Sequence, residues 1–159
     1  YEDSRYYSDK ETKCELHFCD IHNIHRMRTS LQYLIMGCQG QGNKRSDDFF
    51  DTIQKSKWLQ HVRNLVMKSV QIAKAMVEGK SVLVHCSDGW DRTAQLCALA
   101  QVMLDPYYRT IEGLAVLIEK DWCAFGHQFE KRGGHGSSKY ADSERSPIFI
   151  QFLDALWQI

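Results

Sequence analysis

The feature that most constrains this chain is a cysteine placed six residues before an arginine, the pair Cys86 and Arg92. The apolar run 81–84 precedes the pair, and a stretch with helical character, 93–100, follows it. This order predicts a strand, a tight loop and the start of a helix. The first N–H groups of a helix have no partner within the helix, and the helix dipole adds positive charge there. Such a loop therefore predicts a binding site for an anion such as phosphate.

The residue types in the loop favour phosphoryl transfer. The reactive form of cysteine is the thiolate, which the helix start, the loop amides and Arg92 would all stabilise at Cys86. Arg92 can also grip two phosphate oxygens, Gly89 permits a positive φ, and Thr93 can reach the sulfur. The alternative is a buried core cysteine at the end of a strand. The flanking patterns together favour Cys86 as the nucleophile of a phosphatase and Arg92 as its phosphate clamp.

Outside the loop, the pattern is mainly helical. Polar and apolar residues alternate over 13–19, which predicts a half-buried strand. Helices are predicted over 23–37, over 57–78 with Gly79 at its end, and over 93–104. A fourth helix is predicted from Thr110 to Glu119 or Trp122. A fifth is predicted from Ser146 as N-cap, with Pro147 in the first turn. Few strands and many helices around a strand–loop–helix site predict a helix-rich α/β layered fold.

The composition is typical of one globular domain. The 159 residues are 43% hydrophobic and carry a formal net charge of zero, so no overall field favours nucleic acid. The six cysteines are scattered without paired metal-ligand spacing, which predicts reduced thiols in a cytoplasmic protein. The sequence has no signal-peptide pattern and no apolar stretch of membrane-spanning length. We expect an enzyme with no metal or other cofactor and no nucleic-acid partner.

The residues at 85–93, His-Cys-Ser-Asp-Gly-Trp-Asp-Arg-Thr, resemble the signature of the myotubularin-related phosphoinositide phosphatases. These are a branch of the cysteine-dependent protein tyrosine phosphatase superfamily. The resemblance continues over nearly the whole chain, in segments 21–28, 105–110, 125–132 and 146–152. It implies a protein tyrosine phosphatase-like layered fold. It also implies removal of the 3-phosphate from phosphatidylinositol 3-phosphate, and possible action on phosphatidylinositol 3,5-bisphosphate, through a cysteinyl-phosphate intermediate.

Two aspartates in the signature are candidates for the general acid that protonates the leaving alkoxide. The resemblance implies Asp91, because related enzymes keep an aspartate at that position inside the signature, and Asp88 is the second candidate. A neighbouring phosphate dianion raises the pKa of a carboxyl group, which suits an acid. The alternative is that either aspartate only orders the loop or holds Arg92.

The resemblance also implies a set of substrate-binding residues. The loop residues are expected to surround the phosphate and the inositol, namely Ser87, Asp88, Gly89 and Trp90. Asn23 matches an asparagine near the inositol site, although it fits equally well as the N-cap of the following helix. Arg132 matches a basic position near the second phosphate, whereas Gln128 departs from the arginine or lysine common at its position. That departure weakens the case for efficient turnover of the bisphosphate.

The resemblance further predicts that residues 1–159 are part of a larger phosphatase domain. An N-terminal lipid-binding domain and both ends of the catalytic domain are expected to lie outside this chain, which would leave apolar surface exposed. The expected location is cytoplasmic, peripheral on endosomal or other intracellular membranes. The expected partners are a phosphoinositide headgroup at a membrane surface and, through regions outside this chain, other myotubularin-family proteins in homo- or heterodimers.

Two other functions are consistent with the sequence. One is a pseudophosphatase that acts as the partner of an active relative, although such proteins typically lose the signature cysteine or arginine, and both are present here. The other is a protein tyrosine or dual-specificity phosphatase. Two aspartates in the loop would repel acidic peptides and suit a polyhydroxylated sugar better.

Overall fold

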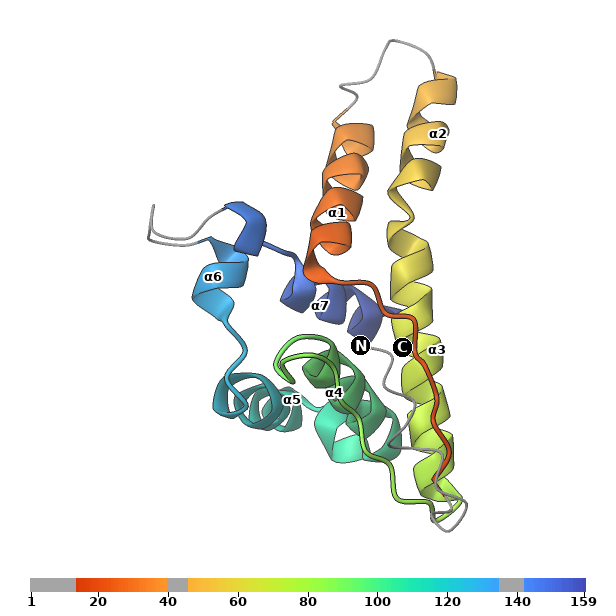
Figure 1. Cartoon of the computed structure of the whole chain (residues 1–159), viewed down its shortest axis with the longest axis vertical. Coiled ribbons are helices and arrows are strands. Elements are labelled where there is room, and N and C mark those ends of the chain that lie inside the picture. The colour runs from red at the N-terminus through yellow and green to blue at the C-terminus, as the bar shows by residue number, and fades with distance from the viewer. Residues whose placement is uncertain (1–13, 40–45, 135–141) are drawn as a thin grey trace.

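The computed structural model of the protein describes residues 14–39, 46–134 and 142–159. Over these residues the chain is helical (Figure 1). The α-helices are α1 (Ile24–Cys38), α2 (Ser46–Ser56), α3 (Trp58–Val77), α4 (Arg92–Leu104), α5 (Ile111–Ile118), α6 (Phe129–Gly133) and α7 (Ile148–Gln158). Two short 3-10 turns, η2 (Pro106–Arg109) and η4 (Asp142–Glu144), and a π-helical turn, η3 (Glu119–Ala124), complete the described elements.

The core lies where α3, α4 and α7 pack against one another. Helix α4 is apolar around most of its circumference, and its residues Leu96, Leu99 and Val102 are buried. A helix of that kind must be covered on several sides, and in Figure 1 α4 lies between α3, α5 and α7. Helix α4 is thus held firmly by its neighbours, and with it the first turn, which follows the loop around Cys86.

An aromatic cluster connects η3, the segment before α6 and helix α7. The Trp122 ring is fully buried, and its centroid lies 4.9 Å from those of Phe149 and Phe152 and 4.8 Å from that of His127. Aromatic pairs at such separations add to the free energy gained from burying their area. The cluster therefore fixes the segment that carries His127 and α6 against α7.

Most of the predicted helices are confirmed. Asn23 caps α1, and its side chain accepts a hydrogen bond from the Arg26 N–H at 3.2 Å. Helix α3 matches the predicted helix 57–78, and Gly79 follows it with φ +78°. Thr110 caps α5 through a 3.0 Å bond from the Gly113 N–H, and the helical path continues through the π turn to Ala124.

The predicted cap of the last helix is wrong. Pro147, not Ser146, is the N-cap residue of α7, and no side chain caps this helix. The Ser146 hydroxyl donates instead to the Ile24 carbonyl at 2.8 Å, and its N–H donates to the Arg132 carbonyl at 3.0 Å. The contact with α1 therefore competes successfully with the local cap.

The α/β prediction is wrong over the described residues, because neither predicted strand forms there. Residues 14–19 of the predicted strand 13–19, and all of 81–84, run without regular secondary structure, while residue 13 lies outside the described ranges. Leu83 is 86% exposed. A strand exists only through hydrogen bonds to a neighbouring strand, and no described segment provides one for either run. The helix-rich part of the prediction is confirmed.

Candidate active site

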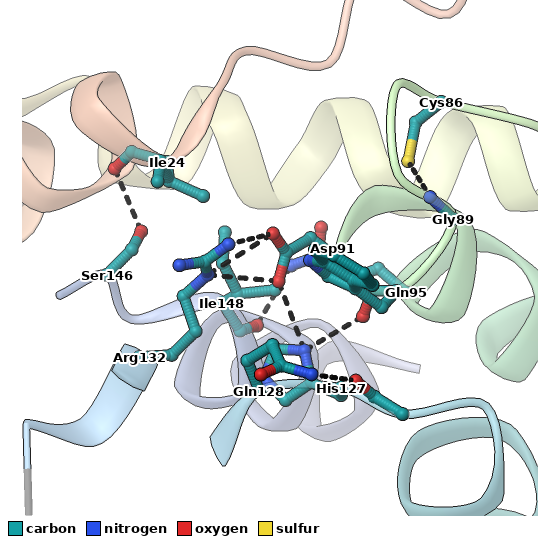
Figure 2. Close-up of polar contacts among 12 residues, drawn as sticks. Ile24, Cys86, Gly89, Asp91, Gln95, His127, Gln128, Arg132, Ser146 and Ile148 are labelled. Atoms are coloured by element: carbon teal, nitrogen blue, oxygen red, sulfur yellow. Dashed lines mark hydrogen bonds and ion pairs between the residues drawn. The ribbon is translucent and has the colours of Figure 1, made fainter. Parts of the chain in front are cut away.

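Cys86 lies in the irregular segment that leads into α4. Its sulfur accepts a hydrogen bond from the Gly89 N–H at 3.2 Å (Figure 2), and Gly89 has φ +86°, as the sequence predicted. Burial raises the pKa of the thiol, but hydrogen bonds from Thr93 and from the Gly89 and Asp88 backbone outweigh burial, so the pKa lies below its usual value. The Thr93 hydroxyl is buried and makes no well-formed hydrogen bond among the described residues, so it remains available to the thiolate.

Arg92 is the first residue of α4, and its guanidinium reaches back over the loop. Its Nη2 donates to the Ser87 hydroxyl at 3.0 Å, and its Nη1 donates to the Ile21 carbonyl at 3.4 Å. The segment before α1 is held in turn by Asn64 of α3, whose Nδ2 donates to the carbonyls of Cys19 and Asp20 at 3.1 and 3.2 Å. The guanidinium is therefore held near the loop by a segment distant in sequence.

A pocket opens over this loop and includes most of the predicted site residues. Its described lining comprises Asn23, Ile24, His25, Cys86, Ser87, Asp88, Asp91, Arg92 and Arg132. Two predicted substrate-binding residues, Gly89 and Trp90, are absent from the lining. Gly89 serves the pocket indirectly, because its N–H bonds the Cys86 sulfur. The structure thus brings together a cysteine thiol of lowered pKa, two guanidinium groups and two carboxylates.

The structure reconciles the two interpretations of Asn23. The side chain caps α1 and also lines the pocket. Its carboxamide oxygen is used by the Arg26 N–H, so the cap fixes the rotamer that a ligand would meet. A cap and a binding residue are therefore compatible here.

Trp90 is held by its backbone. Its carbonyl lies 2.8 Å from Nδ1 of His127, while its indole Nε1 is buried and lacks a hydrogen-bond partner within the described part of the chain. Trp90 is half-buried and does not line the pocket.

Asp91 is the most constrained carboxylate of the site. Arg132 donates to it from Nη2 at 2.8 Å and from Nε at 3.2 Å, and His127 Nδ1 lies 3.1 Å from its Oδ1 (Figure 2). Burial raises the pKa of this carboxyl, but the bonds from His127 and Arg132 outweigh burial and hold the pKa below its usual value. Asp91 is therefore ionised and anchored.

Sequence reasoning did not identify two members of this cluster. His127 is buried, and its Nδ1 faces only acceptors, the Trp90 carbonyl and the Asp91 carboxylate, so this nitrogen carries the hydrogen. Glu144 accepts a hydrogen bond from Arg132 Nη1 at 3.0 Å. Neither residue stands near Cys86 in the sequence, so no spacing pattern indicates these contacts.

Neither a metal site nor a membrane-spanning helix is found over the same residues. Residues 14–39, 46–134 and 142–159 contain no group of three or more His, Cys, Asp or Glu side chains placed to hold a metal ion. Within these ranges, none of the helices combines the length and apolar character needed to cross a bilayer.

Comparison with known proteins assigns the chain to a family. All of residues 1–159 match the family described as myotubularin-like phosphatase domain. The chain is 49% identical over 154 residues to the phosphatidylinositol-3,5-bisphosphate 3-phosphatase mtm-1 of Caenorhabditis elegans, an alignment that covers 96% of this chain and 26% of that protein. Identity is 48% to myotubularin of Xenopus laevis, covering 95% and 25% of the two chains. It is 47% to the phosphatidylinositol-3,5-bisphosphate 3-phosphatase MTMR2 of Mus musculus, covering 95% and 23%.

The chain spans about a quarter of the length of the curated relatives it matches. Two of those relatives carry names that state a phosphoinositide 3-phosphatase activity. The family match covers the complete Cys86–Arg92 loop and the segments around Asn23 and Arg132. On this evidence the chain belongs to the myotubularin-like phosphatase family, a branch of the protein tyrosine phosphatase superfamily.

Proposed function

We propose that this chain carries the active-site loop of a phosphoinositide 3-phosphatase that hydrolyses phosphatidylinositol 3-phosphate. The observation that carries the proposal is the Cys86 thiol, whose pKa is lowered by hydrogen bonds from Thr93 and the loop backbone, in a pocket lined by Arg92. A thiol of lowered pKa in a pocket that also holds a guanidinium matches the needs of nucleophilic attack on a phosphate monoester. The names of two relatives give the substrate class.

The reaction proceeds in two displacements. The Cys86 thiolate attacks phosphorus, an S–P bond forms, and the bond between phosphorus and the inositol 3-oxygen breaks as that oxygen takes a proton from an acid. Water then attacks the cysteinyl-phosphate, gives a proton to the same carboxylate, and releases inorganic phosphate and the thiolate. Arg92 and the loop N–H groups stabilise the charge on the transferring phosphoryl oxygens, and the Thr93 hydroxyl stabilises the departing thiolate.

The proton donor is proposed to be Asp88, with Asp91 as the anchor of the loop. Asp88 lines the pocket and is exposed, so it is free to approach a leaving oxygen. Asp91 also lines the pocket, but it is buried and both of its carboxylate oxygens are already engaged by Arg132 and His127. The contacts support the alternative in which this aspartate orders the loop.

A comparison of substrates tests the proposed function. Purified phosphatase is assayed for phosphate release from phosphatidylinositol 3-phosphate and from a phosphotyrosine peptide, with Cys86→Ser as the inactive control. We expect the lipid to be hydrolysed with much the higher kcat/KM, and Cys86→Ser to remove activity because a hydroxyl ionises far less readily than a thiol. A preference for the peptide would replace this function with that of a protein tyrosine phosphatase, and activity in Cys86→Ser would overturn the mechanism.

A further inference from the structure

His127 lies in the turn between η3 and α6, and aromatic rings enclose its imidazole. The side chain is 1% exposed. Its ring centroid lies 4.8 Å from that of Trp122 and 4.7 Å from that of Phe129, and both rings are close to perpendicular to the imidazole. The backbone is fixed as well, because the His127 N–H donates to the Trp122 carbonyl at 2.9 Å and the Phe129 N–H donates to the His127 carbonyl at 2.9 Å. The orientation of the imidazole is therefore set by its own surroundings.

The two nitrogens of this imidazole have different environments. Nδ1 faces the loop around Cys86, where it lies 2.8 Å from the Trp90 carbonyl oxygen and 3.1 Å from Oδ1 of Asp91 (Figure 2). Nε2 is buried and has no hydrogen-bond partner within residues 14–39, 46–134 and 142–159. A backbone acceptor and a side-chain acceptor from two consecutive residues therefore share the Nδ1–H group.

The shared contact falls in the part of the loop that leads into the phosphate clamp. Trp90 and Asp91 stand between Gly89, whose N–H donates to the Cys86 sulfur at 3.2 Å, and Arg92, the first residue of α4. A trans peptide unit is planar, so its C=O and N–H groups point in opposite directions. Because His127 holds the Trp90 carbonyl, the Asp91 N–H is turned away from His127. The same contact restricts the backbone that carries Arg92.

We propose that His127 is a positioning residue for phosphoryl transfer, which holds the Trp90 carbonyl and the Asp91 carboxylate so that the loop N–H groups and Arg92 face the transferred phosphate. The inference rests on the proposed function, because it concerns the loop that carries out that reaction. His127 is absent from the described lining of the pocket and acts through the loop. Donors aimed in advance at the transferred oxygens stabilise the transition state more than the bound substrate. Loss of the imidazole donor should therefore lower kcat much more than it changes KM.

Two amide variants test whether the donor must stand at the Nδ1 position. In His127→Asn the carboxamide nitrogen can take the place of Nδ1, whereas in His127→Gln the added methylene carries it to the region of Nε2. Each purified phosphatase is assayed on short-chain phosphatidylinositol 3-phosphate. We expect His127→Asn to keep kcat within about fivefold of wild type, and His127→Gln to lose about tenfold to a hundredfold in kcat with KM changed by less than about threefold. His17→Gln, at a side chain that is 77% exposed, is the control and should change neither value.

A mimic of the transition state separates positioning from a purely structural role. Vanadate resembles the transferring phosphoryl group, whereas inorganic phosphate resembles the product. We expect the inhibition constant of vanadate to rise in His127→Gln by the same factor as kcat falls, and that of phosphate to rise less. A variant that only lowers the fraction of folded enzyme would lower the apparent kcat but leave both inhibition constants unchanged.

The variants are also assayed on para-nitrophenyl phosphate, which keeps failure of this inference separate from failure of the proposed function. Wild-type enzyme that hydrolyses this ester but not the lipid would overturn the proposed function, and the ester would then still test His127. Unchanged kcat in His127→Gln, an equal loss in His127→Asn, or a fall in kcat without weaker vanadate inhibition would overturn the role of His127. If His127→Gln does not fold, as its melting temperature would show, His127→Phe removes the donor, fills the aromatic surroundings and is measured in its place.

Discussion

The Asp91 carboxylate and the Arg132 guanidinium form a buried ion pair in which two nitrogens of one side chain contact the carboxylate of the other, the shortest contact being 2.8 Å. The pair joins the last residue before α4 to the helix α6, across 41 positions of sequence. His127 contacts the same carboxylate at 3.1 Å. The loop that carries Cys86 is therefore fixed at its C-terminal end by residues that belong to a distant segment.

Replacement of Arg132 by methionine should strongly destabilise the protein. A buried carboxylate left without its cation costs about 3–5 kcal/mol at neutral pH, whereas Arg109→Met at an exposed position should change the free energy of unfolding by less than about 0.5 kcal/mol. Urea denaturation of both variants measures these differences. A loss below about 1 kcal/mol in Arg132→Met would show that the pair adds little beyond the desolvation of its members.

The same pair predicts the direction of a pH effect. The folded pKa of Asp91 is lowered, so the ionised carboxylate stabilises the fold at all pH values above its unfolded pKa of about 3.9. That contribution is lost as the pH falls through the lower, folded pKa. In Arg132→Met the guanidinium no longer lowers the pKa of Asp91. The difference in free energy of unfolding between this variant and wild type should therefore shrink as the pH falls from about 5 to about 3. A difference that stays constant over this range would contradict the assignment.

The Thr93 hydroxyl should set the reactivity of Cys86. Thr93→Val keeps the shape of the side chain and removes a hydrogen bond that lowers the pKa of the thiol. The pH midpoint for alkylation of Cys86 by iodoacetamide should rise, because the charged form of the thiol loses a stabilising contact. Cys86→Ser identifies the background from the other thiols. An unchanged midpoint would show that the backbone N–H groups alone stabilise the thiolate.

The two aspartates of the loop should differ in their substrate dependence. Asp88→Asn removes the proposed acid, so kcat on phosphatidylinositol 3-phosphate should fall about a hundredfold or more. On para-nitrophenyl phosphate, whose leaving group needs little protonation, the same variant should lose far less. Asp91→Asn should lose activity on both substrates and melt at a lower temperature. Selective loss on the lipid in Asp91→Asn would make Asp91 the acid instead.

Gly113 should not tolerate a side chain. A Cβ atom at this position would lie 1.9 Å from the Tyr107 carbonyl oxygen and 3.0 Å from the Tyr108 Cα, both backbone atoms. Gly113→Ala should therefore force α5 away from η2 and lower the free energy of unfolding by about 1–3 kcal/mol, although alanine favours helices elsewhere. Glu112→Ala, at the exposed neighbouring position, is the control. Equal melting temperatures for the two variants would contradict this packing.

Two features of the structure could be predicted from the sequence alone. The spacing of Cys86 and Arg92 indicated the nucleophile and the phosphate clamp, and the structure places both at one pocket. Helix α1 and its Asn23 cap were likewise evident. The hydrogen bonds from Gly89 to Cys86, from Arg92 to Ser87 and from Arg26 to Asn23 join residues at most five positions apart, because bonds within a helix turn or a tight loop depend on the residues that form it.

Other features depend on residues far apart in the chain. The run 81–84 has the composition of a strand, yet strand formation requires a neighbouring strand, which no described segment provides. Ser146 has the pattern of a cap, but the packing of α1 presents the Ile24 carbonyl to its hydroxyl. Sequence alone determined the local chemistry of the loop around Cys86. Only the tertiary structure decided that Asp91 is held by Arg132 and Arg132 by Glu144, because such contacts arise when the core brings distant helices together.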